Sequence, residues 1–276
     1  MRLPLQQVTL VAIDTRAPAL AAQSLQRSMA HVEFARTLLF GCNWQVSALL
    51  PQIEYVEIAP IRSGAEYSEF VLRRLAPYIE SSHVLVTQWD GFVVDATAWR
   101  DEFLQHDYIG AVWPDQASGR NVGNGGFSLR SRRLLAAGSD PRITELHPED
   151  EVLCRRYREL LEHEHGLRFA PADLARQFAF ENESPRAATF GFHGPVNLPR
   201  FLDEPTIAAA LDALPDEFFR SRDARRLARA LLFRSMPATA QSLLQRRRAA
   251  GRNEPASRLL SAASSLLLRW HAARGL

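Results

Sequence analysis

The chain contains 276 residues, of which 46% are hydrophobic and 23% are charged, and these proportions are those of a soluble globular protein. Its two cysteines are far apart, which argues against a disulfide scaffold and a cysteine-based zinc site, and no run approaches the ~18 apolar residues that a membrane-spanning helix needs. The formal net charge of +2 is unevenly spread, because residues 216–276 carry 13 Arg and 4 acidic residues whereas residues 1–215 carry 20 Arg and 27 acidic residues. An acidic body with a basic tail suggests that the tail faces an anionic surface.

Strand-like and helix-like segments alternate along the first part of the chain. The strands are short apolar runs that end in polar residues, and the helices carry apolar residues three or four positions apart. We expect strands at 8–14, 44–50, 54–60, 82–90 and 107–113, and helices at 19–32 and 63–79. This alternation predicts an α/β domain of Rossmann type, with a mostly parallel sheet flanked by helices.

Polar residues follow two of the predicted strands. Asp14, Thr15 and Arg16 come after the first strand, and Gln88 and Asp90 lie where the strand at 82–90 ends. Ligands of open parallel sheets bind beyond the carboxyl ends of the strands. Asp-Gly is also a common turn pair, so a purely structural role for the aspartate stays open.

A glycine-rich segment, VGNGGFSLRS, occupies residues 122–131. Its glycines and Asn124 permit backbone conformations that other residues avoid, and they let a ligand approach the main chain. The spacing matches neither the dinucleotide-binding fingerprint nor the phosphate loop, which requires a lysine. A ligand-binding loop and a simple turn are both compatible with this pattern.

Three acidic residues follow Pro148 at the start of a helix predicted within 147–165, namely Glu149, Asp150 and Glu151. The helix dipole stabilises carboxylates at this end by about 0.3–1 kcal/mol, which would explain the cluster without any function. A helix tip can also aim a carboxylate into a cleft as a general base.

His193 lies in the motif TFGFHG, after alternating aromatic residues. A lone histidine is more often structural than a ligand. Beside an aspartate, however, a neutral imidazole suits a divalent transition metal such as Mn²⁺. Both interpretations remain open.

The composition changes after residue 205, where the sequence becomes helical and rich in arginine and loses its strand signals. We therefore expect a domain at 1–205 and a helical basic extension at 206–276. An apolar stripe at helical spacing lies near the end of the extension and consists of Leu259, Leu260, Ala263, Leu266, Leu267 and Trp270. A basic amphipathic helix at 255–276 can lie on an anionic membrane or pack against the body or a partner chain.

Taken together, these segments resemble a bacterial family of unknown function that is grouped with the nucleotide-diphospho-sugar glycosyltransferases of GT-A fold. The resemblance rests on YSEFVLRRL, VLVTQWDGFVV, WRDEFL with DYIGAVW, GNGGFSLRSRRLL, HPEDEVLCRRYRELLE, FAPADLARQFAFE and FGFHG. It covers residues 8–200 and leaves the arginine-rich tail uncovered.

The resemblance implies a donor site at the carboxyl ends of the strands. Its nucleotide-binding residues would be Asp14, Thr15, Arg16, Tyr67 and Ser68. The tripeptide QWD stands where GT-A enzymes carry Asp-x-Asp, whose acids hold a divalent cation on the donor diphosphate. Here Gln88 replaces the first acid, and Asp90 with His193 would bind Mn²⁺ or Mg²⁺.

The resemblance also implies an acceptor side. Asn124, Gly125 and Gly126 would form the wall near the donor sugar and the acceptor. Asp150, with Glu149 as the second candidate, would remove the proton of the acceptor hydroxyl in an inverting transfer.

The combined prediction is a glycosyltransferase that uses a nucleotide-sugar donor and a glycan or lipid-linked acceptor, in cell-surface polysaccharide assembly. The alternative is a non-catalytic nucleotide- or glycan-binding module on the same fold, which the glutamine at position 88 favours. A third interpretation is a metal-dependent hydrolase built on His147, Glu149, Asp150 and His193.

The surroundings of the protein can also be predicted. The amino-terminal stretch has no uninterrupted apolar run of signal-peptide length, so we expect a cytoplasmic protein, peripheral on the inner face of the membrane if the basic helix binds lipid. Nucleic acid is not an expected partner, because the body is acidic and the tail has few aromatic residues to stack on bases.

Overall fold

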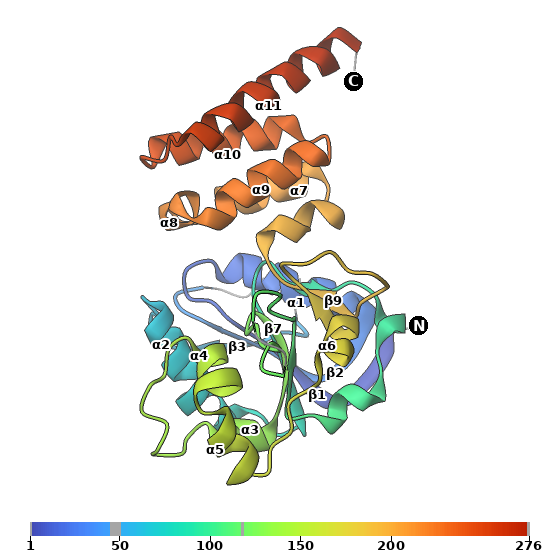
Figure 1. Ribbon diagram of the computed structural model, residues 1–276, viewed down its shortest axis with the longest axis vertical. Coiled ribbons are helices and arrows are strands. Elements are labelled where there is room, and N and C mark those ends of the chain that lie inside the picture. Colours follow the sequence, from blue (N-terminus) through green and yellow to red (C-terminus); the bar gives the residue numbers. More distant parts are fainter. Residues whose placement is uncertain (1, 45–50, 117–118, 275–276) are drawn as a thin grey trace. The chain divides into compact units, whose positions relative to one another are not determined.

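The computed structural model describes residues 2–44, 51–116 and 119–274. The chain divides into two compact units, Met1–His193 and Gly194–Leu276 (Figure 1). The second unit thus begins before residue 205, where the composition changes. Of the strand predicted at 44–50, all but Trp44 lies outside the described residues.

A six-stranded sheet forms the centre of the first unit, with the order β3-β2-β1-β4-β7-β6. Its strands are β1 (Leu3–Ile13), β2 (Val32–Gly41), β3 (Glu54–Glu57), β4 (His83–Thr87), β6 (Tyr108–Gly110) and β7 (Phe127–Ser131). The first four run parallel, and β7 runs antiparallel to both β4 and β6. The predicted α/β fold with a mostly parallel sheet and a helical extension is confirmed.

Alternating residues of β1 enter two different cores. Leu10 and Ala12 pack with Leu25 of helix α1 (Pro18–His31) on one face of the sheet. Val11 and Ile13 belong to a second core on the other face. Fully burying a leucine or valine contributes about 1.5–3 kcal/mol, so burial on both faces explains the continuous apolar run of this strand.

The second core contains residues of a helical segment with three successive geometries. It starts as α2 (Gly64–Glu69), continues as the π-helix η1 (Phe70–Arg74) and ends as the 3-10 helix η2 (Ala76–Tyr78). The helix predicted at 63–79 is therefore present but irregular. Pro77 lies in the last turn, where its missing N–H prevents a regular α-helical bond.

Strand β2 was not predicted. Its first half mixes apolar residues with Glu33 and Arg36 and is largely exposed or half-buried, and only its second half is continuously buried. This mixed pattern resembles neither a buried strand nor an alternating one, and β2 is defined by its parallel pairing with β1.

A small second sheet has the order β5-β9-β8. Its strands are β5 (Phe92–Val93), β8 (Ala179–Phe180) and β9 (Gly191–Phe192). Phe127, Phe178 and Phe190 pack their rings together beside it, with centroids 5.4–6.2 Å apart. This sheet brings the turn after β4 next to the segment around residue 193.

The remaining helices of the first unit are short. They are η3 (Ala96–Ala98), η4 (Asp101–Gln105), α3 (Arg132–Ala137), α4 (Glu149–Glu151), η5 (Val152–Arg156), α5 (Arg158–His163) and α6 (Ala172–Phe178). The single helix predicted within 147–165 is thus divided into α4, η5 and α5.

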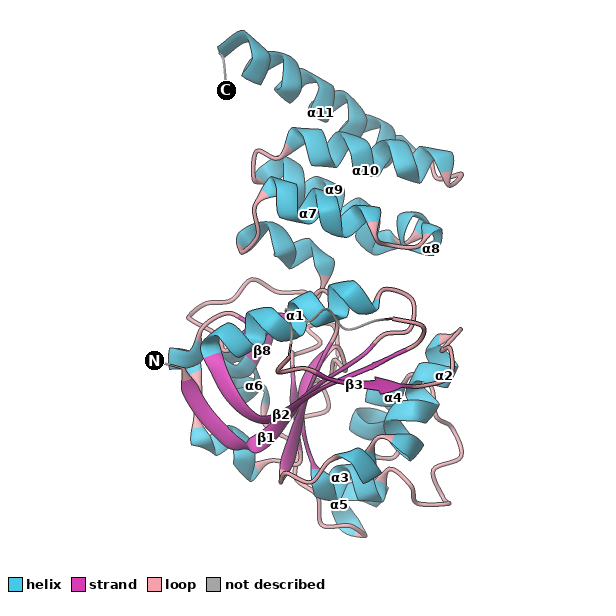
Figure 2. Cartoon of the chain, turned by 180° about the vertical axis from the view of Figure 1, so that it is seen from behind, coloured by secondary structure: helices cyan, strands magenta, loops and turns pink. Residues whose placement is uncertain are grey.

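The second unit is helical (Figure 2). It consists of η6 (Pro195–Arg200), α7 (Glu204–Asp212), α8 (Asp216–Arg220), α9 (Arg222–Phe233), α10 (Pro237–Ala249) and α11 (Pro255–Arg274). Arg247 is 1% exposed and donates to the carbonyl oxygens of Phe219 at 2.8 Å and Ser221 at 2.5 Å. Within the described residues, no helix has the length and apolar character needed to span a bilayer.

Candidate functional site

Three loops leave the central sheet at the same edge. Ala12 of β1 pairs with Thr87 of β4, and Thr87 pairs with Phe127 of β7. Because β7 is antiparallel, the loop before it meets the loops that follow β1 and β4. The site predicted from the strand ends therefore corresponds to one edge of the sheet, where open α/β folds bind ligands.

Asp90 lies in a tight turn after β4. The N–H of Gly91 donates to the carbonyl oxygen of Gln88 at 3.1 Å. The carbonyl oxygen of Gly91 accepts from the hydroxyls of Thr87, at 2.7 Å, and Ser24. The turn is thus tied to both β4 and α1, and Asp90 is 6% exposed.

His193 is the centre of a polar cluster. Its Nε2 lies 3.3 Å from Asp90 Oδ1 and 3.2 Å from Gln88 Oε1. Its Nδ1 lies 3.1 Å from Glu181 Oε1 and 3.1 Å from the amide nitrogen of Asn124. The structure therefore places three predicted site residues, Gln88, Asp90 and Asn124, around the imidazole of a fourth, His193.

Strand pairing explains these contacts. Phe92 pairs antiparallel with Phe192, which places the preceding turn beside residue 193. Phe180 pairs in parallel with Phe192, so the next residues of the two strands, Glu181 and His193, are neighbours. Glu181 was not predicted as a site residue. The only sequence signal for this pairing was the similarity of the dipeptides Ala179–Phe180 and Gly191–Phe192. Strands of two residues are too short to be identified by periodicity.

The charge of His193 follows from its neighbours. Burial by itself lowers the pKa of an imidazole, but the carboxylates of Asp90 and then Glu181 raise the pKa of His193 well above its ordinary value. The two carboxylates, one at each ring nitrogen, thus favour the protonated form of His193.

This arrangement does not fit a divalent cation at Asp90 and His193. Asp90 and Glu181 lie at opposite nitrogens of the His193 ring, so the two carboxylates cannot share one ion. Among the described residues, no group of three or more His, Cys, Asp or Glu side chains is arranged to hold a metal. We therefore assign no step to a cation.

The glycine-rich loop lies directly against these side chains. A Cβ atom at Gly126 would overlap the His193 ring, and one at Gly125 would overlap the Glu149 carboxylate. Asn124 adopts a φ of 62°, a conformation that asparagine tolerates better than most residues. Larger side chains at these positions would overlap the cluster. Close packing alone therefore accounts for the glycines, and a bound ligand is not needed to explain them.

Two neighbouring acids have different environments. Glu149 is 6% exposed and pairs with the fully buried Arg130 at 3.0 Å. Asp150 accepts from the N–H of Gly125 at 3.1 Å. Burial, followed by the charge of Glu149, raises the pKa of Asp150, although the Gly125 bond lowers it. Glu149 is held by a structural ion pair, whereas Asp150 is the better candidate base.

Ser68 supports the same helix tip. Its hydroxyl lies 2.9 Å from His147 Nδ1 and accepts from the N–H of Glu149 at 3.2 Å. The nearby Tyr67 hydroxyl is buried, and burial followed by the Glu149 charge raises its pKa. Ser68 is 1% exposed, so its contacts are with the protein.

The residues after β1 make a separate set of contacts. Asp14 Oδ1 accepts from the N–H groups of Arg16 and Ala17, both at 2.8 Å, which supports the start of α1. The Thr15 hydroxyl accepts from the N–H of Ile61 at 2.9 Å. Arg16 is exposed. These residues lie at the predicted sheet edge, but their contacts are with α1 and the loop before α2.

A family model described as a protein of unknown function, DUF5672, matches residues 51–193, just over half of the chain. The chain belongs to the DUF5672 family. The DUF5672 segment contains Gln88, Asp90, the glycine-rich loop, Asp150 and His193, so the whole polar cluster belongs to it. It ends where the first compact unit ends.

The DUF5672 chain is also similar to solved structures. One is the galactosyltransferase LgtC in complex with donor and acceptor sugar analogues, with a TM-score of 0.46, 14% identity and coverage of 76% of this chain and 98% of that chain. Another is a glycosyltransferase involved in glycosylation of the major capsid of PBCV-1, with a TM-score of 0.39, 11% identity and coverage of 67% and 91%. No curated protein matches.

Proposed function

We propose that the first unit is a glycosyltransferase. It moves a sugar from a nucleotide-diphosphate donor to a glycan or lipid-linked acceptor, in an inverting transfer that serves cell-surface polysaccharide assembly. The observation that carries the proposal is the convergence of Asp150, the loop at 124–126 and the His193 cluster at one edge of the sheet. The sequence resemblance supplies the reaction class.

Asp150 is the general base in this proposal. Burial raises its pKa, which makes its carboxylate a better proton acceptor for the acceptor hydroxyl. The N–H of Gly125 orients the carboxylate at 3.1 Å. The Arg130–Glu149 ion pair holds the helix tip that carries it.

The nucleotide would bind along the ends of β1 and β4. Asp14, Thr15 and Arg16 would contact the base and ribose, with Tyr67 and Gln88 nearby. His193 would act as a positioning residue, because its two ring nitrogens lie within hydrogen-bond distance of the carboxylates of Asp90 and Glu181 and so link the turn after β4 to β8.

The first test is a thermal-shift screen of nucleoside diphosphates, each with and without Mn²⁺. A ligand at about 100 times its dissociation constant should raise the free energy of unfolding by about 2.7 kcal/mol. We expect a shift that does not require Mn²⁺, because the His193 cluster does not fit a cation. A shift that requires Mn²⁺ would restore the metal site predicted from the sequence, and no shift with any nucleotide would contradict the donor proposal.

Asp150→Asn separates the enzyme from a non-catalytic binding module, the alternative that Gln88 favours. An enzyme loses about 10²–10⁴-fold in turnover when its general base is removed, while nucleotide binding is retained. Asp101→Asn, an exposed aspartate in η4, is the matched control. Equal turnover of both variants would remove Asp150 from the mechanism.

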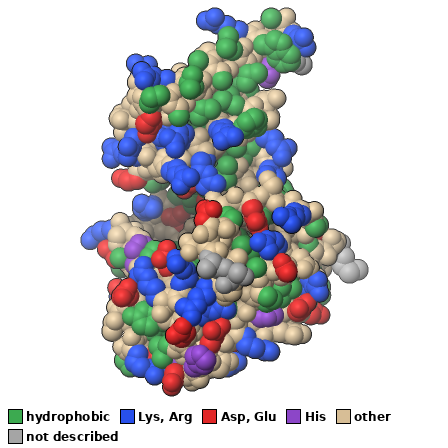
Figure 3. Space-filling view, viewed as in Figure 1, with side chains coloured by type: hydrophobic (Ala, Val, Ile, Leu, Met, Phe, Trp, Pro, Cys, Tyr) green, Lys and Arg blue, Asp and Glu red, His purple; other side chains and the backbone are tan. Residues whose placement is uncertain are grey.

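We also propose that α11 binds an anionic membrane surface from the cytoplasmic side. Its only buried residues are two serines, Ser257 and Ser264. Leu259 and Leu266 are 72% and 66% exposed, and the helix contains arginines but no acidic residue. Hydrophobic and basic side chains lie exposed together over the helical unit (Figure 3), as a membrane-surface helix requires.

A further inference from the structure

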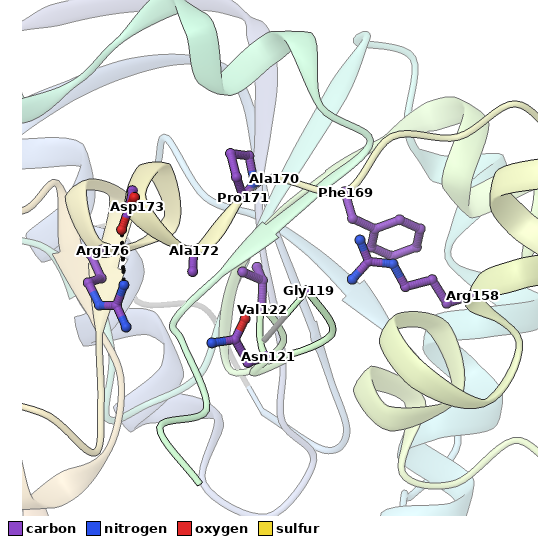
Figure 4. A pocket seen from close by; sticks show the side chains of 10 residues that line it. All are labelled: Gly119, Asn121, Val122, Arg158, Phe169, Ala170, Pro171, Ala172, Asp173 and Arg176. Carbon is purple, nitrogen blue, oxygen red and sulfur yellow. Dashed lines mark hydrogen bonds and ion pairs between the residues drawn. The ribbon is translucent and has the colours of Figure 1, made fainter. Parts of the chain in front are cut away.

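A pocket of about 530 Å³ opens in the first unit, apart from the His193 cluster. Its lining comes from the segment before the glycine-rich loop, from α5 and from the segment leading into α6 (Figure 4). The volume lies within the range of small-molecule sites. None of the sequence patterns predicted this pocket.

Arg158 is the unusual residue of the lining. It is 9% exposed, and its guanidinium lies over the Phe169 ring, 4.6 Å from the centroid. Its Nε donates to Glu162 at 2.9 Å, but within the described part of the chain Nη1 and Nη2 donate no hydrogen bond. A buried guanidinium with free donors suits a planar anion, which can accept two parallel hydrogen bonds.

The rest of the lining favours a sugar over a simple anion. Figure 4 shows Arg158 and Arg176 at opposite ends, with Asn121 and Val122 between them. The amide of Asn121 makes no side-chain hydrogen bond to other described residues, so it can pair with hydroxyl groups. Small apolar residues, namely Val122, Ala170, Pro171 and Ala172, provide surface for the C–H face of a ring.

Both arginines of the pocket pair with carboxylates through part of the guanidinium. The charged lining residues are Arg158, Arg176 and Asp173, and Arg158 also pairs through Nε with Glu162, which leaves its two Nη groups for a ligand. Arg176 donates to Asp173 at 3.2 Å and to Glu183 at 2.9 Å, so it is partly neutralised. The Asp173 side chain is 97% exposed, and solvent therefore screens it.

We infer that this pocket binds an acidic sugar, with the carboxylate or phosphate at Arg158 and the hydroxyls at Asn121. The inference rests on the pocket alone and does not require transferase activity.

The test is equilibrium binding to the full chain without nucleotide, by calorimetry or ligand-observed NMR. The probes are glucuronate, glucose 6-phosphate, glucose and acetate. We expect one acidic sugar to bind at least about tenfold more tightly than glucose, as a charge-assisted hydrogen bond implies. Tighter binding of glucuronate would show that the acidic group bound at Arg158 is a carboxylate, and tighter binding of glucose 6-phosphate would show that it is a phosphate.

Three variants locate the binding. Arg158→Gln should reduce affinity for the acidic sugar to that for glucose. Asn121→Asp should also reduce the affinity for the acidic sugar, because it places a negative charge in the pocket. The Asn121 side chain is half-buried and makes no hydrogen bond to other described side chains, so this variant can still be tested if the arginine variant unfolds. Arg168→Gln removes an exposed arginine that does not line the pocket and should change affinity by less than about twofold, since solvent screens an exposed charge.

Several results would overturn the inference. They are equal binding of glucose and both acidic sugars, acetate binding as tightly as glucuronate, no binding of any probe, or wild-type affinity in Asn121→Asp. A failed nucleotide screen would contradict the glycosyltransferase proposal but leave this result standing, so the two can be judged separately.

Discussion

The two units of the chain bury their charged side chains differently. In the first unit, Arg130 and His193 are each paired with carboxylates at the edge of a sheet. In the second, the buried Arg247 makes its short hydrogen bonds to the carbonyl oxygens at the end of α8, as a cation at a helix carboxyl end does, and its carboxylate partner Glu254 lies farther away, at 3.4 Å, and is partly exposed. Buried ion pairs are costly to desolvate, so their concentration at one sheet edge indicates a polar site, whereas Arg247 is explained by helix packing.

Arg130→Met should have the largest effect, because it leaves Glu149 buried without its cation. Removing one partner of a buried pair costs about 3–5 kcal/mol, to be measured as the free energy of unfolding in denaturant. Arg132→Met changes an exposed arginine in the same segment and is the matched control. A loss below about 1 kcal/mol, the range of surface pairs, would mean that the pair is solvated.

Arg247→Met should cost less, about 1–3 kcal/mol, because it leaves neutral carbonyl oxygens unsatisfied and because the carboxylate that it leaves, Glu254, is 34% exposed to solvent. The adjacent exposed arginine provides the control variant Arg248→Met. The same denaturant titration applies to both. If Arg247→Met were more destabilising than Arg130→Met, the contrast between the two units would be reversed.

His193 should make the stability of the first unit depend on pH. Its pKa is higher in the folded chain than the value of about 6.5 expected in the unfolded chain. Its stabilising contribution is therefore complete below about pH 6.5 and is lost as the pH rises through the folded-state value, with a slope of at most about 1.4 kcal/mol per pH unit.

The measurement compares the pH dependence of unfolding for the wild type and His193→Gln. The difference in their free energies of unfolding should shrink as the pH rises above about 6.5. His163→Gln, at an exposed histidine of α5, is the matched control. Parallel curves for wild type and His193→Gln would show that the imidazole carries no extra proton in the folded chain.

Substitutions on α11 should have the smallest effect on stability. Leu259→Ser combined with Leu266→Ser changes two exposed side chains, so the free energy of unfolding should move by no more than about 0.5 kcal/mol per site. Co-sedimentation with anionic vesicles should nevertheless be lost. Phe233→Ser, at a residue of α9 that is 76% exposed, is the matched control, and vesicle binding that survives the double change would refute the membrane proposal.

Much of the fold was predictable, because buried strands and amphipathic helices have distinct periods. The helix expected at 19–32 is α1 (Pro18–His31), and the strand expected at 82–90 contains β4 (His83–Thr87). Strand β2 was missed because its pattern is mixed. The two-residue strands β5, β8 and β9 have no period at all, and they are the elements that bring His193 to Asp90.

The sequence by itself determined the α/β alternation, the polar residues at the strand ends and the candidates Asp90, Asp150 and His193, since composition and local spacing encode burial and turns. Only the tertiary structure decided their chemistry. Glu181 meets His193 through strand pairing, and Arg130 pairs with Glu149 across 19 residues of chain. The protonation of an imidazole or a carboxylate depends on neighbours within a few ångströms, and the register between distant segments determines which neighbours those are.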